Sequence, residues 1–292
     1  MCEKGCYEMK VAIIANTKKE RTKTVLTRFV KLLAQEHIDV VLFEDLRPFL
    51  GDGYCYRNRH MLFEDVEFIV SFGGDGTILY TARLSEGLGI PILGVNLGKV
   101  GFLAEIFPEE IDQIPQKLKS GDYEIIDRMA FSAETSCGNH YFALNDVVLD
   151  RNTNTRLLGF SVSVTDQYAG EFHADGLIVS TPTGSSAHSM AAGGPLVMPE
   201  CDVIVLTPIC PHSLSIRPMI IDGSKEVEIG VLEGQARMAV DGQNFVDVPA
   251  GSKVKIKKNY EPVRVARFRD KTYFDILHTR LGWGVSLKQK NA

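Results

Sequence analysis

Apolar and polar positions follow two alternating patterns along the first 122 residues. Short, almost entirely apolar runs are typical of strands buried on both faces of a parallel sheet. Between them, segments 25–33 and 109–119 place apolar residues at helical spacing, with Pro108 suited to a first helical turn. The apolar runs lie at 11–15, 40–43, 68–72 and 90–95. This alternation predicts a doubly wound, Rossmann-like α/β domain over residues 1–122.

After Gly121 the pattern changes to closely spaced short strands with turn residues between them. Many short strands at this spacing predict an all-β, sandwich-like domain over residues 123–268. Apolar residues return to helical spacing in 273–281, before Gly282. We therefore expect a C-terminal helical segment, 269–292, that packs back on the first domain. The expected strands lie at 124–126, 141–144, 147–149, 160–164, 177–179, 203–206, 226–231, 237–240, 254–256 and 263–268.

Composition narrows the class of protein. The 292 residues are 45% hydrophobic and 24% charged, as in an ordinary soluble globular protein. The net charge of −5 disfavours nucleic-acid binding, and no apolar run is long enough to span a membrane. Six scattered cysteines and an N-terminus without an apolar signal core indicate reduced thiols and a cytoplasmic location.

The clearest candidate for chemistry is the glycine-rich sequence 73–77, Gly-Gly-Asp-Gly-Thr, between a predicted strand and a predicted helix. Ligands of such sheets bind at strand ends, and glycines let backbone N–H groups approach phosphates and adopt positive φ. The helix N-terminus adds a favourable dipole, and Asp75 would face the phosphates, their counter-ion or an attacking hydroxyl. The alternative is a tight turn with a capping aspartate. The chain has neither G-x-G-x-x-G nor a Walker A motif, which excludes ordinary dehydrogenases and P-loop NTPases.

Two further segments are rich in hydrogen-bonding groups. Residues 175–195 lead from a predicted strand into a turn of hydroxyl and small residues, suited to phosphate, ribose or adenine. The pair Asn145-Asp146 interrupts the apolar pattern of 142–149. A buried polar pair needs partners, which either a ligand or a turn could supply.

Together these segments resemble the NAD kinase family. The sequences GGDGT at 73–77, GKVGFLAE at 98–105, LND at 144–146 and DGLIVSTPTGSSAHSMAAGGP at 175–195 occur in that family's order and spacing. Diacylglycerol and sphingosine kinases and phosphofructokinases share GGDG, so the long final block is the specific part. The resemblance implies transfer of the γ-phosphoryl group of ATP to the 2′-hydroxyl of the adenosine ribose of NAD. It also implies a divalent metal such as Mg²⁺ and a homo-oligomer, a dimer or tetramer.

The resemblance also implies roles for individual residues, with Asp75 as the general base. The implied phosphate loop consists of Gly73, Gly74, Gly76 and Thr77. The implied NAD-binding residues are Asp75, Gly76, Asn145, Asp146, Arg156, His173, Asp175, Ser186, Ala187, His188, Ser189, Met190, Ala191 and Gln243. It assigns no metal ligand.

Three of these positions depart from the family's usual residues. Asp146 stands where the family usually has Glu, and its side chain is one methylene shorter. His188 replaces a tyrosine with a smaller ring that titrates, and Ala191 replaces a serine hydroxyl.

Two other functions fit parts of the pattern. A lipid or other alcohol kinase could share GGDG, but the hydroxyl-rich block 181–188 does not suit an apolar substrate groove. A non-catalytic NAD(P) sensor could use the same scaffold, although the presence of Asp75 argues against it.

Overall fold

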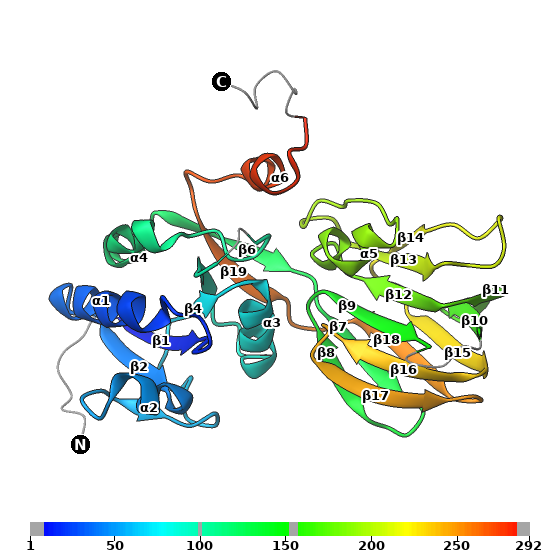
Figure 1. Cartoon of the computed structure of the whole chain (residues 1–292), viewed down its shortest axis with the longest axis horizontal. Coiled ribbons are helices and arrows are strands. Elements are labelled where there is room, and N and C mark those ends of the chain that lie inside the picture. The colour runs from blue at the N-terminus through cyan, green and yellow to red at the C-terminus, as the bar shows by residue number, and fades with distance from the viewer. Residues whose placement is uncertain (1–8, 99–100, 152–156, 285–292) are drawn as a thin grey trace. The chain divides into compact units, whose positions relative to one another are not determined.

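The computed structural model describes residues 9–98, 101–151 and 157–284. It separates into two compact units, which Figure 1 shows in one view. The first unit comprises the chain up to Ile126 and again from Arg264, and the second comprises Asp127–Val263. The predicted fold class is confirmed: an α/β unit, an all-β sandwich and a C-terminal helix, α6 (Tyr273–Leu281).

The first unit is built on a seven-stranded sheet of order β3-β2-β1-β4-β5-β19-β6. Its strands are β1 (Lys10–Ala15), β2 (Asp39–Phe43), β3 (Tyr56–Arg57), β4 (Phe68–Gly73), β5 (Ile92–Asn96), β19 (Val263–Phe268) and β6 (Tyr123–Arg128). From β3 to β19, neighbouring strands pair in parallel. The order reverses between β1 and β4, so the loops after these strands leave the sheet at its topological switch point.

Helices explain why the central strands are continuously apolar. Residues of α1 (Thr22–Gln35) and α4 (Ile114–Ser120) share one core cluster with the sheet, and α3 (Asp75–Leu84) lies on the opposite face. Every residue of β4 is buried. Strands covered on both faces can expose no polar side.

The structure differs from the hydropathy prediction at three places in the first unit. Strands β6 and β19 join the parallel sheet, because an isolated apolar run does not reveal which sheet it pairs with. The helix expected over 109–119 divides into a 3₁₀ helix, Pro108–Gln113, and α4. Pro115 has no N–H to continue the first helix, whereas it fits the first turn of a new one.

The second unit is a sandwich of two six-stranded sheets whose neighbouring strands are antiparallel. One sheet has the order β11 (Gln167–Ala174), β10 (Leu158–Val164), β15 (Val227–Glu233), β18 (Lys253–Lys258), β7 (Phe131–Thr135) and β8 (His140–Ala143). The other has the order β14 (Met219–Asp222), β13 (Val203–Ile209), β12 (Gly176–Ser180), β9 (Asp146–Asp150), β16 (Gln235–Val240) and β17 (Asn244–Pro249). Apolar residues from both sheets form one core cluster, including Phe131, Phe160, Leu177 and Met238.

The segment after β12 folds as a 3₁₀ turn, Gly184–Ser186, followed by the short helix α5 (His188–Ala191). No helix in the described ranges is both long and apolar enough to cross a membrane.

Candidate functional site

The glycine-rich loop lies where β4 ends and α3 begins. The Gly74 N–H donates to Thr77 Oγ1 at 3.4 Å, which folds the loop back on the first helical turn. A Cβ atom on Gly73 would lie 2.0 Å from Thr77 Oγ1, so only glycine fits there. Neither Gly73 nor Gly74 nor Gly76 has a positive φ, so that part of the sequence argument was wrong. Glycine is needed at Gly73 because the Thr77 side chain lies too close for a Cβ atom there.

Asp75 is held by backbone groups from a distant segment of the first unit. Its Oδ2 accepts the Phe102 N–H at 2.8 Å, and its Oδ1 accepts the N–H groups of Leu103 and Ala104 at 3.0 and 3.2 Å. A Cβ on Gly101 would lie 1.9 Å from Asp75 Oδ1, so Gly101 permits this approach. A carboxylate has about four acceptor sites. Among the described residues, two donors bond to Oδ1 and one to Oδ2, which leaves one acceptor position on Oδ2 for a substrate hydroxyl.

Two other loops at this edge of the sheet carry polar side chains that the sequence reasoning did not single out, Asn96 and Lys19. After β5, Asn96 Oδ1 accepts the Gly98 N–H at 2.8 Å, and the Leu97 N–H donates to the Gly73 carbonyl at 2.7 Å. A Cβ on Gly98 would lie 3.2 Å from Nζ of Lys19, in the loop after β1. The Lys19 ammonium group therefore lies beside the segment bonded to the glycine-rich loop. The sequence feature that could have pointed to Lys19 is its position in the loop after a strand at the topological switch point.

The second unit contains a pocket of about 340 Å³. It brings together four residues singled out in the sequence: Asn145, Asp146, Ala187 and His188. The remaining lining residues are Val148, Asp150, Ala239, Asp241, Gly242 and Phe245.

Asp241 explains why the strand pattern breaks at Asn145. Its carboxylate accepts the backbone N–H groups of Leu144, Asn145 and Asp146 at 3.0, 2.7 and 3.2 Å. These three N–H groups lie where β8 ends and β9 begins, and the Asp241 carboxylate supplies their acceptors. Asp241 itself is 8% exposed and has a φ of 52°. Its DG sequence is also typical of an ordinary surface turn, so its burial could not be predicted.

The polar pair at 145–146 contributes two unusual groups to the pocket. Asn145 Oδ1 is buried, and no donor in the described part of the chain reaches it. Asp146 is 5% exposed, and burial together with the nearby Asp241 charge raises its pKa to about 7. Buried acceptors in folded proteins normally have a partner, so Asn145 is suited to receive a ligand N–H or O–H.

The hydroxyl-rich turn after β12 packs against the segment that carries Asn145 and Asp146. Thr181 Oγ1 donates to the Leu144 carbonyl at 2.6 Å and accepts the Gly184 N–H at 3.1 Å. A Cβ on Gly184 would lie 2.1 Å from the carbonyl oxygen of Asn145. The Thr-Pro-Thr-Gly sequence therefore fixes the backbone of Asn145.

The comparisons with known proteins agree with one another over most of the chain. The ATP-NAD kinase N-terminal domain matches residues 56–123, and the ATP-NAD kinase C-terminal domain matches residues 144–268. A NAD kinase from Pseudomonas entomophila (strain L48) is 34% identical over 285 residues, covering 95% of this chain and 96% of the relative. The chain belongs to the NAD kinase family. A NAD kinase from Wolinella succinogenes is also 34% identical, over 279 residues, 94% of this chain and 96% of its own.

Solved structures of the NAD kinase family share this fold. Yeast NADH kinase complexed with NADH has a TM-score of 0.87 at 24% identity, over 95% of this chain and 89% of its own. An NAD kinase from Archaeoglobus fulgidus in complex with ATP has a TM-score of 0.74 at 25% identity, over 92% and 97%.

Several residues suggested by the NAD kinase resemblance lie outside the lining of the pocket. The hydroxyls of Ser186 and Ser189 point to protein partners, the Thr183 carbonyl at 3.1 Å and Thr207 Oγ1 at 2.8 Å. Met190 and Ala191 follow on α5, and Gln243 follows the Asp241-Gly242 turn. Contacts of these residues with NAD stay predictions.

The remaining predicted residues are His173, Asp175 and Arg156. The exposed His173 ring lies with Nε2 3.4 Å from Glu233 Oε2. Asp175 forms an ion pair with Arg151 at 3.2 Å. Arg156 lies outside the described residues.

The fit of a divalent metal can be judged from the donors present. Within residues 9–98, 101–151 and 157–284, no group of three His, Cys, Asp or Glu side chains could hold a metal ion. Mg²⁺ commonly uses one or two carboxylates together with substrate phosphates. Asp75, the single carboxylate of the glycine-rich loop, has one acceptor position left among its described contacts, so it can take a metal ion or a substrate hydroxyl but not both. With that position used by the hydroxyl, a divalent metal would be held by the substrate phosphates.

Proposed function

We propose that this chain transfers the γ-phosphoryl group of ATP to the 2′-hydroxyl of the adenosine ribose of NAD, giving NADP. The observation that carries the proposal is the placement of Asp75. Its carboxylate stands at the N-terminus of α3, directly after a buried parallel strand, with one acceptor position left on Oδ2. Family membership with proteins named NAD kinase supports the choice of substrate.

In this proposal the second unit supplies the dinucleotide pocket. Asn145 Oδ1 offers an unused acceptor, and the exposed His188 ring lies at the lining of the same pocket. These groups suit the hydroxyls and amino groups of a nucleoside.

The first unit supplies the phosphate chemistry. Phosphoryl transfer passes through a loose transition state, so the nucleophile keeps its proton until late. Asp75 therefore orients the 2′-hydroxyl through Oδ2 and accepts its proton as the new P–O bond forms. The start of α3 and the Lys19 ammonium stabilise negative charge on the phosphates. If ATP is bound as Mg-ATP, the metal would neutralise part of the phosphate charge, while Asp75 keeps its remaining acceptor position for the 2′-hydroxyl.

We also propose that the protein is a cytoplasmic homo-oligomer assembled through its second unit. The four described cysteines are free, which is typical of a reducing compartment. Tyr168, Met219 and Ile220 are at least half-exposed on the edge strands β11 and β14. Exposed apolar side chains on strand edges are suited to pairing with a second copy. A mass measurement by light scattering tests this directly: a dimer or tetramer supports it, and a monomer contradicts it.

The catalytic proposal is tested by supplying Mg-ATP with either NAD or diacylglycerol. Product is measured with an NADP-specific dehydrogenase in the first case and by lipid extraction in the second. NADP formation alone supports the proposal. Lipid phosphorylation would favour an alcohol kinase, and tight NAD binding without any product would favour a sensor.

A further inference from the structure

The C-terminal segment of the first unit contacts the same stretch of chain that Asp75 holds. Phe102, whose N–H donates to Asp75 Oδ2, packs its ring in a buried cluster with Tyr273, Ile276 and Leu277 of α6. The Arg280 guanidinium group lies 5.5 Å from the centre of the Phe102 ring. One residue therefore contacts Asp75 through its backbone and α6 through its side chain.

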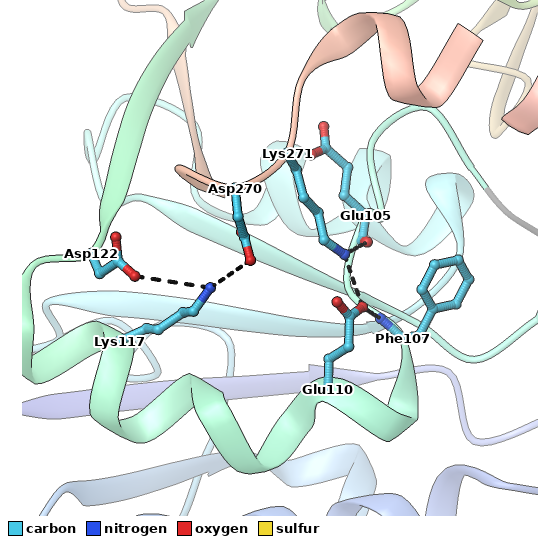
Figure 2. Close-up of polar contacts among 7 residues, drawn as sticks. All are labelled: Glu105, Phe107, Glu110, Lys117, Asp122, Asp270 and Lys271. Atoms are coloured by element: carbon cyan, nitrogen blue, oxygen red, sulfur yellow. Dashed lines mark hydrogen bonds and ion pairs between the residues drawn. The ribbon is translucent and has the colours of Figure 1, made fainter. Parts of the chain in front are cut away.

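Lys271, just before α6, holds the next part of that stretch (Figure 2). Its ammonium group donates to the Glu105 carbonyl at 2.7 Å and to Glu110 Oε2 at 2.8 Å, with the Phe107 ring centre 5.5 Å away. Glu110 Oε2 also accepts the Phe107 N–H at 2.7 Å. The Lys271 side chain is 20% exposed, so these bonds compete with little water.

We propose that Lys271 and α6 position the catalytic carboxylate of Asp75 by fixing residues 102–107. Every backbone hydrogen bond that the Asp75 carboxylate accepts from the described residues comes from residues 102–104, so its orientation depends on where that stretch lies. The core restrains part of the stretch, since the Ile106 N–H donates to the Gly94 carbonyl at 3.2 Å. The C-terminal segment restrains both sides of this point, through Phe102 on one and Glu105 and Phe107 on the other. Lys271 is thus a positioning residue, and it lies well beyond residues 175–195, the last of the sequence blocks that carry the family resemblance.

The same view contains a matched control (Figure 2). Lys117 forms ion pairs with Asp270 at 3.0 Å and Asp122 at 3.9 Å, and its side chain is 15% exposed. It therefore ties down the residue preceding Lys271 with a similar kind of contact. Within the described part of the chain, the polar and ring contacts of the Lys117 side chain are with Asp122, Asp270 and Phe268 and not with residues 102–107, so it shares the stabilising role without the positioning role.

The first test measures hydrogen–deuterium exchange of the backbone amides of residues 102–104 in the full chain. In Lys271→Met we expect exchange to become at least about tenfold faster, because the variant loses both charge-assisted hydrogen bonds of the ammonium group and either one accounts for roughly that factor. In Lys117→Met exchange should match the wild type, although both variants lose similar thermal stability. Unchanged exchange in Lys271→Met, or equal acceleration in both variants, would overturn the proposal. If Lys271→Met does not fold, Glu110→Gln supplies the test, because it weakens the same contact and keeps an acceptor for Phe107.

The second test is kinetic and rests on the proposed function. Lys271→Met should lower kcat for NADP formation roughly 10- to 100-fold, the usual scale for a misplaced catalytic group, with little change in KM for NAD. Lys271→Arg, which keeps the charge, should recover most of this loss, and Lys117→Met should keep the wild-type kcat. A rise in KM without a fall in kcat would contradict the proposal. Since amide exchange is measured without substrate, failure of the NAD kinase assignment would leave its result intact.

Discussion

Replacing Asp146 by Asn should remove a pH-dependent loss of stability from the second unit. Asp146 is 5% exposed, and burial first, then the charge of Asp241, raises its pKa from 3.8 to about 7. Between these two values the folded chain retains a proton on Asp146 that the unfolded chain has lost. The free energy of unfolding therefore falls as pH rises through this window and levels off above about 7.

The size of this effect follows from the shift. Each unit of pKa difference corresponds to about 1.4 kcal/mol, so the window from 3.8 to about 7 corresponds to about 4 kcal/mol. This is a large fraction of the free energy of unfolding of an ordinary domain, which is roughly 5–15 kcal/mol.

Urea unfolding of wild type and Asp146→Asn over this pH range measures the effect. The variant should gain stability relative to wild type as pH rises, by about 4 kcal/mol in total, and the difference should level off near neutrality. Asp247→Asn, at an exposed carboxylate on β17, is the control and should show no such trend. A difference between wild type and Asp146→Asn that stays flat with pH would refute the reasoning. Because Asp146 lines the pocket, its titration should also make KM for NAD more strongly pH-dependent in wild type than in the variant.

Two further substitutions test individual parts of the site. Lys19→Ala should raise KM for ATP about tenfold, because the variant loses a charge-assisted bond to phosphate, whereas Lys18→Ala should leave this KM unchanged. Steady-state kinetics with ATP varied measures both values. An equal KM for ATP in the two variants would contradict the role assigned to Lys19. Gly184→Ala should destabilise the second unit by about 1–3 kcal/mol and raise KM for NAD, because the new methyl group would lie 2.1 Å from the Asn145 carbonyl oxygen. Gly53→Ala, whose methyl group would meet nothing within 4 Å, is its control in urea unfolding, and an equal effect of both would argue against the Gly184 packing.

Local patterns were sufficient to predict the elements that carry the first half of the site. The apolar run before Gly73 and the helix after it could be recognised because a strand covered on both faces leaves no polar position. The end of α6 at Gly282 was equally predictable, since Gly282 adopts a φ of 64° that suits glycine.

Long-range contacts account for what could not be predicted. The bonds from Asp75 to residues 102–104 and from Asp241 to residues 144–146 join positions roughly 27 and 96 residues apart. No local periodicity encodes such pairings, and a buried DG turn has the same sequence as an exposed one. Lys271 was missed for the same reason, because its partners lie 161 and 166 residues away.

The most direct test of the central claim is kcat for NADP formation from NAD and Mg-ATP in the Asp75→Asn variant. The account predicts a fall of about 10²- to 10⁴-fold relative to wild type, because the amide cannot accept the hydroxyl proton. Asp65→Asn is the matched control, an exposed aspartate of the same unit whose φ of 58° asparagine also tolerates, and it should keep the wild-type kcat. An Asp75→Asn variant that folds and turns over at the wild-type rate would contradict the assignment of Asp75 as the base.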